Sequence, residues 1–280
     1  MYKRQAYTTA FAQTVKPFKE GDRAVFLGNS ITDGGRYHSF IWLYYMTRFP
    51  NMPIRVFNGG IGGDTAYDMN KRLDGDIFSK NPTVLMVTFG MNDSGYYEYN
   101  GDNAKEFGEQ KYQESIKNFQ QMEKRFKELP HTRIVMTGTS PYDETAQIKD
   151  NTVFKKKNET IKRIIEYQRE SAARNGWEFT DWNAPMVAIN QELQQKDPSF
   201  TLCGNDRIHP DNDGHMVMAY LFLKAQGFAG KDVANMEINA NKKQAVKAEG
   251  CTISNIKKIG KDISLSLIHI SEPTRLALIS

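Results

Sequence analysis

Short apolar runs recur along the first two thirds of the chain and predict the strands of a buried sheet. Four of them lie at Ala24–Leu27, Ile54–Phe57, Val84–Phe89 and Ile134–Met136. They do not alternate between apolar and polar residues and are rich in β-formers, which is typical of strands covered on both faces. We expect a fifth strand at Trp177–Thr180.

Between these runs, apolar residues recur at the spacing of α-helices. The clearest helix is predicted by apolar residues three or four positions apart with polar residues between them, namely Tyr112, Ile116, Phe119, Met122, Phe126 and Leu129. A second helix runs from about Phe154 toward Ala172 and is expected to stop at Asn175-Gly176. The last one, from about residue 211 to 226, is apolar almost all round through Met216–Leu223, so we expect it to be wedged into the core.

Strands that alternate with helices indicate a parallel sheet joined by right-handed crossovers. The predicted fold class is therefore α/β, a three-layer α/β/α sandwich with a central parallel sheet of about five strands, of the flavodoxin-like kind. Ligands of such sheets bind beyond the carboxyl ends of the strands. Polar residues that directly follow the apolar runs are thus the first candidates for chemistry.

The composition is that of a packed globular protein and gives no sign of a nucleic-acid or membrane partner. Of the 280 residues, 39% are hydrophobic and 25% charged, which argues against a disordered or fibrous chain. The formal net charge is only +4, and Lys3 and Arg4 supply two of those charges, so we expect no nucleic-acid partner. No stretch reaches the apolar length of a membrane span. The single basic run, Lys155-Lys156-Lys157, is expected on the solvated face of a helix.

Residues 1–21 are expected to be a leader outside the fold. Met1–Gln5 resembles translated sequencing-adapter read-through, as found at the edges of metagenomic reading frames. Ala10-Phe11-Ala12 then fits the cleavage pattern of a secretory signal peptide whose other regions are lost, which would make the protein periplasmic or secreted. An ordinary N-terminal segment of a cytoplasmic protein explains the same residues equally well.

The C-terminal part has a different character. From about Gly230 the patterns fade into Lys- and Asn-rich sequence, and short β-like pieces return over Cys251–Leu265. We expect residues 229–265 to be a linker and the truncated start of an accessory β-domain. Residues 266–280 are expected to be a non-native tail, because Leu267–Arg275 also resembles adapter read-through.

The two cysteines do not indicate a metal site. Cys203 and Cys251 show neither a CxxC spacing nor a Cys/His ligand pattern. We expect two unpaired thiols, no metal and no cofactor.

A small-polar turn, Gly28-Asn29-Ser30-Ile31-Thr32-Asp33, joins the first predicted strand to a helix. A serine at this junction has its hydroxyl at the carboxyl end of a strand, beside helix N–H groups whose partial positive charge can stabilise an oxyanion. A serine before a helix is also the usual N-cap residue, and taken alone this turn favours the cap.

Three further blocks supply what an activated serine needs. They are Asn58-Gly59-Gly60-Ile61-Gly62-Gly63-Asp64, Gly90-Met91-Asn92-Asp93 and Asp206-Arg207-Ile208-His209-Pro210. Together with the serine turn they resemble the SGNH (GDSL-type) hydrolases, a family of serine esterases named for its Ser, Gly, Asn and His. The resemblance covers about residues 22–228, which we expect to be the hydrolase domain, and it implies the same α/β/α architecture.

The resemblance also implies a role for each matching residue. Ser30 would be the nucleophile, His209 the general base and Asp206 the carboxylate that orients it. The backbone N–H groups of Ser30 and Gly63 and the side chain of Asn92 would bind the oxyanion. This set corresponds to the chemistry of a serine hydroxyl that is activated by a neutral imidazole.

Four other residues are candidates for substrate binding. Asn29 stands where the family usually has Asp, which keeps the shape of the turn and removes its charge. His38 lies one or two helical turns beyond Ser30, where it either lines the pocket or packs inside the domain. Tyr96 and Tyr97 follow the Asn92 block and form either an aromatic wall for substrate or the packing of a loop.

These residues predict a serine-dependent hydrolase that cleaves short acyl esters, above all acetyl esters of carbohydrates, through an acyl-enzyme. Tyr96, Tyr97 and Tyr99 could cover a sugar ring, and no apolar lid is evident near Ser30. A lipase or thioesterase of the same family and a non-catalytic carbohydrate-binding module on the same fold are the alternatives. Phosphate-binding, dinucleotide-binding and α/β-hydrolase motifs are incomplete, because GK[ST], GxGxxG and GxSxG are not formed.

Overall fold

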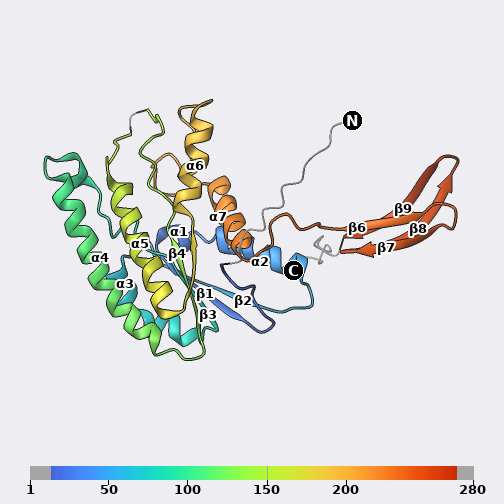
Figure 1. Ribbon diagram of the computed structural model, residues 1–280, viewed down its shortest axis with the longest axis horizontal. Coiled ribbons are helices and arrows are strands. Elements are labelled where there is room, and N and C mark those ends of the chain that lie inside the picture. Colours follow the sequence, from blue (N-terminus) through green and yellow to red (C-terminus); the bar gives the residue numbers. More distant parts are fainter. Residues whose placement is uncertain (1–13, 150, 270–280) are drawn as a thin grey trace, which may run out of the picture.

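A five-stranded parallel sheet forms the centre of the protein (Figure 1). The computed structural model describes residues 14–149 and 151–269. The strands follow the order β2-β1-β3-β4-β5, and every neighbouring pair is parallel. Their bounds are β1 (Arg23–Gly28), β2 (Arg55–Gly60), β3 (Val84–Val87), β4 (Arg133–Gly138) and β5 (Glu178–Asp181). The predicted α/β fold class and number of strands are confirmed.

The inner strands are covered on both faces, as their unbroken apolar runs predicted. Successive residues of β1 feed two different cores, with Ala24 and Phe26 in one and Val25 and Leu27 in the other. The edge strand β2 differs from the expectation, because most of it is only partly buried and it runs on to Gly60. The glycines that follow the predicted strand therefore extend it before the chain turns away.

Helices cover both faces of the sheet. The helices α2 (Tyr37–Arg48) and α7 (Asn212–Ala225) pack together over the Phe26 side, and α3 (Ala66–Lys71) and α4 (Ala104–Lys127) cover the Leu27 side. The remaining α-helices are α1 (Ser30–Asp33), α5 (Lys157–Asn175) and α6 (Asn183–Gln194), and short turns of other helix types are η1 (Leu73–Ile77), η2 (Phe78–Lys80) and η3 (Tyr97–Asn100). The predicted stop of α5 is confirmed, since Gly176 takes the left-handed conformation at its C-cap with φ of 66°.

The structure contradicts the expectation for one residue of the basic run, since Lys155 and Lys156 are exposed as expected but Lys157 is not. Lys157 is fully buried at the first turn of α5 and does not face solvent. The expectation was wrong because a run of charges is only a local pattern, whereas the direction of a side chain at a helix start depends on how that helix docks.

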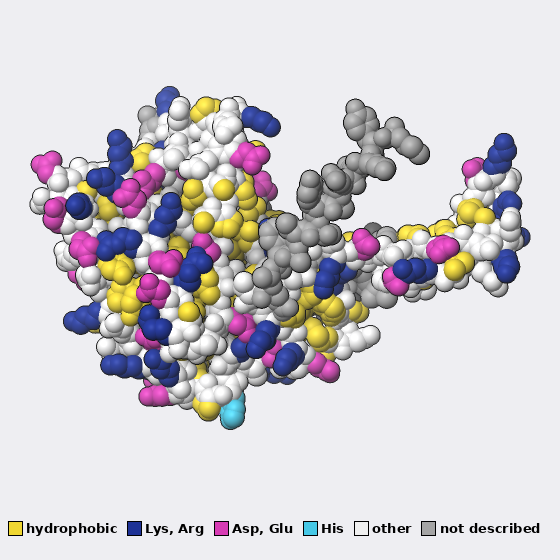
Figure 2. All heavy atoms as spheres, in the orientation of Figure 1, with side chains coloured by type: hydrophobic (Ala, Val, Ile, Leu, Met, Phe, Trp, Pro, Cys, Tyr) yellow, Lys and Arg dark blue, Asp and Glu magenta, His cyan; other side chains and the backbone are white. Residues whose placement is uncertain are grey.

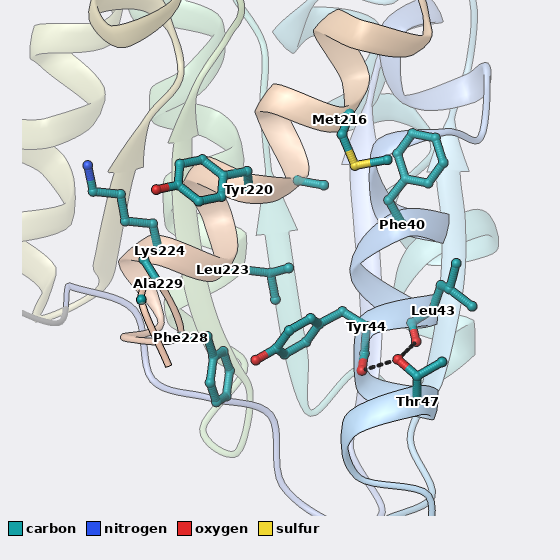
Figure 3. Close-up of a pocket in the computed structure, with 12 residues that line it drawn as sticks. Phe40, Leu43, Tyr44, Thr47, Met216, Tyr220, Leu223, Lys224, Phe228 and Ala229 are labelled. Carbon is teal, nitrogen blue, oxygen red and sulfur yellow. Dashed lines mark hydrogen bonds between the residues drawn. The ribbon is translucent and has the colours of Figure 1, made fainter. Parts of the chain in front are cut away.

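The final helix is only partly inside the core. Met218, Ala219 and Phe222 are buried as expected, but Met216 and Tyr220 are each 53% exposed. They line an apolar groove of 470 Å³ between α2 and α7, together with Phe40, Leu43, Tyr44 and Phe228 (Figure 3). The groove contains none of the residues that the sequence proposes for chemistry.

Two β-hairpins follow the α/β body and project away from it (Figure 1). They pair β6 (Asn235–Asn239) with β7 (Gln244–Glu249), and β8 (Cys251–Ile259) with β9 (Asp262–His269), both antiparallel. The expected boundary between residues 265 and 266 falls inside β9. The expectation of a leader up to residue 21 outside the fold was wrong for residues 14–21, because Val15 and Phe18 are buried in the core. The leader up to residue 13, including Ala10-Phe11-Ala12, and the tail from residue 270 lie outside the described residues.

Charges of both signs are interspersed over the face of the molecule seen in Figure 2, on the body and on the hairpins. Among the residues that the structure describes, no helix is long and apolar enough to cross a membrane.

Candidate active site

The serine turn is built by its neighbours. Gly28 ends β1, and a Cβ at this position would lie 2.0 Å from Thr32 Oγ1, so only glycine allows the chain to fold back so tightly. Asn29 is the N-cap of α1, and its Oδ1 accepts a hydrogen bond of 3.1 Å from the N–H of Ile31. The neutral amide thus provides the capping acceptor without a charge, and Ser30 occupies the first position of the helix.

The Asp206–Pro210 block meets the serine turn although the two are far apart in the sequence. Ser30 Oγ lies 2.7 Å from His209 Nε2, across a sequence separation of 179 residues, and His209 Nδ1 lies 2.6 Å from Asp206 Oδ2. An ionised carboxylate only accepts hydrogen bonds, so His209 donates from Nδ1 and its Nε2 accepts from the serine hydroxyl. This arrangement can remove the hydroxyl proton as Ser30 attacks a carbonyl carbon.

The pKa values of the pair move in the directions that this arrangement requires. Burial alone would raise the pKa of Asp206, but hydrogen bonds from the His209 ring and from the backbone of His209 and Ile208 lower it below its usual value. The hydrogen bond to Asp206 raises the pKa of His209, against the opposing effect of burial. Both shifts favour an ionised carboxylate beside a more basic imidazole.

The loop that carries Asp206 and His209 is held from behind by Arg207. This residue is buried and has a φ of 67°, an uncommon conformation for a side chain of its size. Its Nη1 donates to the carbonyl oxygens of Asp143 and Ala146 at 3.1 and 2.8 Å, and its Nε donates to Asn151 Oδ1 at 3.2 Å. Nothing in the sequence near Arg207 indicates that this side chain is buried, so its role was not expected.

The Gly63 and Asn92 blocks meet beside the serine turn. Gly63 is exposed and has a φ of 83°, which favours glycine. Asn92 Nδ2 donates to the carbonyl oxygen of Asp64 at 2.9 Å, so the amide lies beside the backbone that follows Gly63. A primary amide has two N–H groups, and the second is available to an oxyanion.

Arg72 joins two of the blocks, the serine turn and the Asn58–Asp64 block, and no local pattern in the sequence indicates this role. Its Nε forms an ion pair of 2.6 Å with Asp64 Oδ2, and its Nη2 donates to the carbonyl oxygens of Gly28 and Gly59. One guanidinium thus ties the ends of β1 and β2 to the loop after Gly63.

The candidate substrate-binding residues lie in different surroundings. His38 is buried against Phe26 and Tyr37, and its Nε2 donates to the carbonyl oxygen of Thr32 at 3.2 Å. Burial lowers its pKa. This geometry favours the packed alternative for His38.

The three tyrosines after Asn92 do not form one aromatic wall. Tyr97 is 79% exposed, with its ring edge against Phe154. Tyr96 is half-buried, and its hydroxyl donates to Asn92 Oδ1 at 2.5 Å. Tyr99 is buried, and its hydroxyl contacts Ser94 and Thr160, so it does not line a surface for substrate.

No metal centre accompanies this site within the described ranges. There, no group of three or more His, Cys, Asp and Glu side chains could hold a metal ion. Cys203 and Cys251 are both free and buried, and Cys203 Sγ donates to the carbonyl oxygen of Pro141.

Comparison with known proteins identifies relatives of the α/β body. The family model of the GDSL-like lipase/acylhydrolases matches residues 26–217. An acetylxylan esterase of Geobacillus stearothermophilus is 25% identical over 224 residues, which are 74% of this chain and 95% of the relative.

Solved structures match as well. One, described as a gut microbial diltiazem-metabolizing enzyme, is 98% identical with a TM-score of 0.89 and covers 92% of this chain. The chain spans only 59% of the length of that protein. A catalytic mutant of an acetylxylan esterase from Geobacillus stearothermophilus has a TM-score of 0.61 at 22% identity, covering 75% of this chain and 96% of its own, which supports the fold alone.

Proposed function

The chain belongs to the GDSL-like lipase/acylhydrolase family, and from this membership we propose that it cleaves short acyl esters, above all acetyl esters of carbohydrates, through an acyl-enzyme on Ser30. The observation that carries the proposal is the pair of contacts of 2.7 Å and 2.6 Å that link Ser30, His209 and Asp206. A serine that served only as a helix cap would not need a paired imidazole, and here Asn29 provides the cap.

The reaction follows from these contacts. Ser30 Oγ attacks the acyl carbon while His209 Nε2 takes the hydroxyl proton, and Asp206 stabilises the imidazolium. The negative charge on the former carbonyl oxygen is bound by the backbone N–H groups of Ser30 and Gly63 and by Asn92 Nδ2. Each such donor contributes a factor of about 10² to 10³ in rate.

The intermediate then collapses and the alcohol leaves with the proton from His209, so that the acyl group remains on Ser30. Water attacks this acyl-enzyme in the same way, with His209 again as the base, and the acid leaves with regeneration of Ser30. All proton transfers are accounted for by one imidazole, and no metal or cofactor is required.

The acetyl preference is supported by the relatives. One is an acetylxylan esterase, and another is described as a diltiazem-metabolizing enzyme. The surroundings of the site are compatible with a bulky alcohol, because Gly62, Gly63 and His209 are exposed. An acetyl ester of a carbohydrate is the substrate named for the first of these relatives.

The apolar groove between α2 and α7 favours the second candidate, a lipase or thioesterase. Both helices follow directly on site residues, since α2 begins seven positions after Ser30 and α7 begins three positions after His209. A long acyl chain bound there would gain up to about 0.8 kcal/mol for each methylene.

The test is an ester panel that separates these candidates. We would measure kcat/KM for 4-nitrophenyl acetate, butyrate and decanoate, and acetate release from acetylated xylo-oligosaccharides. A fall beyond acetyl or butyryl supports the proposal, and a steady rise to decanoyl would move the protein to the lipase or thioesterase branch. Ser30→Ala should lose turnover and labelling by an organophosphonate, whereas Ser39→Ala, on the exposed side of α2, should keep both.

We also propose that the two hairpins after residue 228 are not needed for catalysis, since every proposed catalytic group lies within residues 22–228, and that the leader reflects export to the periplasm or the medium. A variant of residues 13–230 should retain the kcat/KM of the full chain. Inactivity of this variant in a folded state would show that the C-terminal part completes the site.

A further inference from the structure

The amide of Asn92 is held in one orientation by two neighbours. Its Nδ2 donates to the Asp64 carbonyl, which can only accept, so the nitrogen must lie on that side. Its Oδ1 accepts from the hydroxyl of Tyr96 at 2.5 Å. A flip of the amide would put its carbonyl oxygen against the Asp64 oxygen, so these two contacts together determine where the second N–H of Asn92 points.

Tyr96 is itself held by the buried amino group of Lys157. Lys157 Nζ lies 3.8 Å from the centre of the Tyr96 ring, within the range of a cation–π contact. The same amino group donates to the carbonyl oxygen of Met91 and to Ser94 Oγ, both at 2.6 Å, and to the carbonyl oxygen of Gly95. Every one of these partners belongs to the turn that carries Asn92.

Burial of the Lys157 amino group is unfavourable, so its position must be stabilised by its neighbours. Placing an ammonium group inside a protein is unfavourable even after the surroundings relax. Burial accordingly lowers the pKa of Lys157 to about 7, although the nearby carboxylates of Asp93 and Glu144 act in the opposite direction. Three oxygen acceptors and an aromatic face offset this cost only while the turn keeps its shape.

We propose that Tyr96, fixed by Lys157, is a positioning residue that aims the free N–H of Asn92 at the oxyanion. This inference rests on the proposed esterase function and deepens it. Neither residue touches the reacting atoms, so both act through Asn92. Without the Tyr96 hydroxyl the amide can rotate about its side-chain bonds, and the N–H spends only part of its time in the productive direction.

The expected signature is a loss in kcat with little change in KM, because an oxyanion forms only in the transition state. Tyr96→Phe keeps the ring on Lys157 and removes the hydroxyl, and we expect kcat for 4-nitrophenyl acetate to fall about tenfold, a part of the loss for a whole donor. In an Asn92→Ala background the same change should have no further effect. Tyr112→Phe on α4 is the matched control and should keep the kcat of the original chain.

Lys157→Met tests the second step. It removes the amino group at nearly constant length, and kcat should fall by at least as much as in Tyr96→Phe while KM stays within about twofold. If Lys157→Met does not fold, Lys157→Gln takes its place, since its amide retains two donors for the turn. Melting temperatures establish that the compared variants are folded.

The outcomes separate this inference from the proposed function. Full turnover of Ser30→Ala or Asn92→Ala would refute the esterase mechanism itself. If those variants lose activity but Tyr96→Phe keeps the kcat of the original chain, or is fully additive with Asn92→Ala, the positioning role is overturned and the mechanism stands. A folded Lys157 variant with unchanged kcat would show that Tyr96 does not need the lysine.

Discussion

Replacing Asp206 by asparagine changes the hydrogen bonding of His209 while leaving the loop in place. Asp206 Oδ1 accepts from the backbone N–H groups of Ile208 and His209, both at 2.9 Å, and the amide oxygen of asparagine can keep both contacts. The amide nitrogen then faces His209 Nδ1 and donates to it. His209 must therefore carry its proton on Nε2, where it can no longer accept one from Ser30.

The size of the effect follows from this change of tautomer. The equivalent replacement in a Ser–His–Asp triad lowers kcat by a factor of about 10⁴, which corresponds to about 5 kcal/mol of transition-state stabilisation. The melting temperature should change by less than about 4 °C, because at most one exposed hydrogen bond is lost. Catalysis and stability are thereby separated in a single variant.

The assay is kcat for 4-nitrophenyl acetate at pH 8, together with thermal melting. Asp206→Ala is the comparison, because it loses the two backbone contacts as well and should show a lower melting temperature in addition to low activity. If Asp206→Asn retains kcat within tenfold of the original chain, the hydrogen bond from His209 to Asp206 does not set the tautomer, and the assignment of Asp206 is refuted.

Three other outcomes are expected. Because Asp206 raises the pKa of His209 above the usual 6.5 and only the neutral imidazole acts as base, kcat/KM should rise with pH through a midpoint above 6.5, and a midpoint below 6.5 would contradict this pairing. Gly204→Ala should reduce both the melting temperature and kcat, since the φ of Gly204 is 70° and a Cβ would lie 2.2 Å from the His209 carbonyl oxygen. Gly176→Ala is the control, because Gly176 has a φ of 66° but open space around it, and this change should cost only about 1–2 kcal/mol of stability. Equal effects of the two changes would exclude the clash at Gly204. Burial raises the pKa of Cys203 to about 12, so iodoacetamide followed by mass spectrometry should label it only after unfolding in guanidinium, and rapid labelling of the native protein would contradict its burial.

Much of the fold could be predicted because its signals are local. Apolar runs such as Val84–Val87 belong to strands covered on both faces, and the alternation with helices leaves few arrangements besides a parallel sheet. The carboxyl ends of parallel strands share one edge, so the turns after β1, β2 and β3 had to lie near one another. The motif residues Ser30 and His209 could be named from the sequence for the same reason, since their neighbours form recognisable blocks.

Only the tertiary structure decided the contacts of side chains whose neighbours come from distant segments of the chain. The contact of 2.7 Å between Ser30 and His209 depends on how α7 docks beside α2, and Arg72 and Arg207 became visible only through their contacts across separate loops. Lys157 was expected in a solvated run, yet the docking of α5 places its amino group against the turn that carries Asn92. Periodicity reports which residues prefer burial, but whether a particular side chain finds acceptors or remains exposed, as Met216 does, depends on partners far away in the chain.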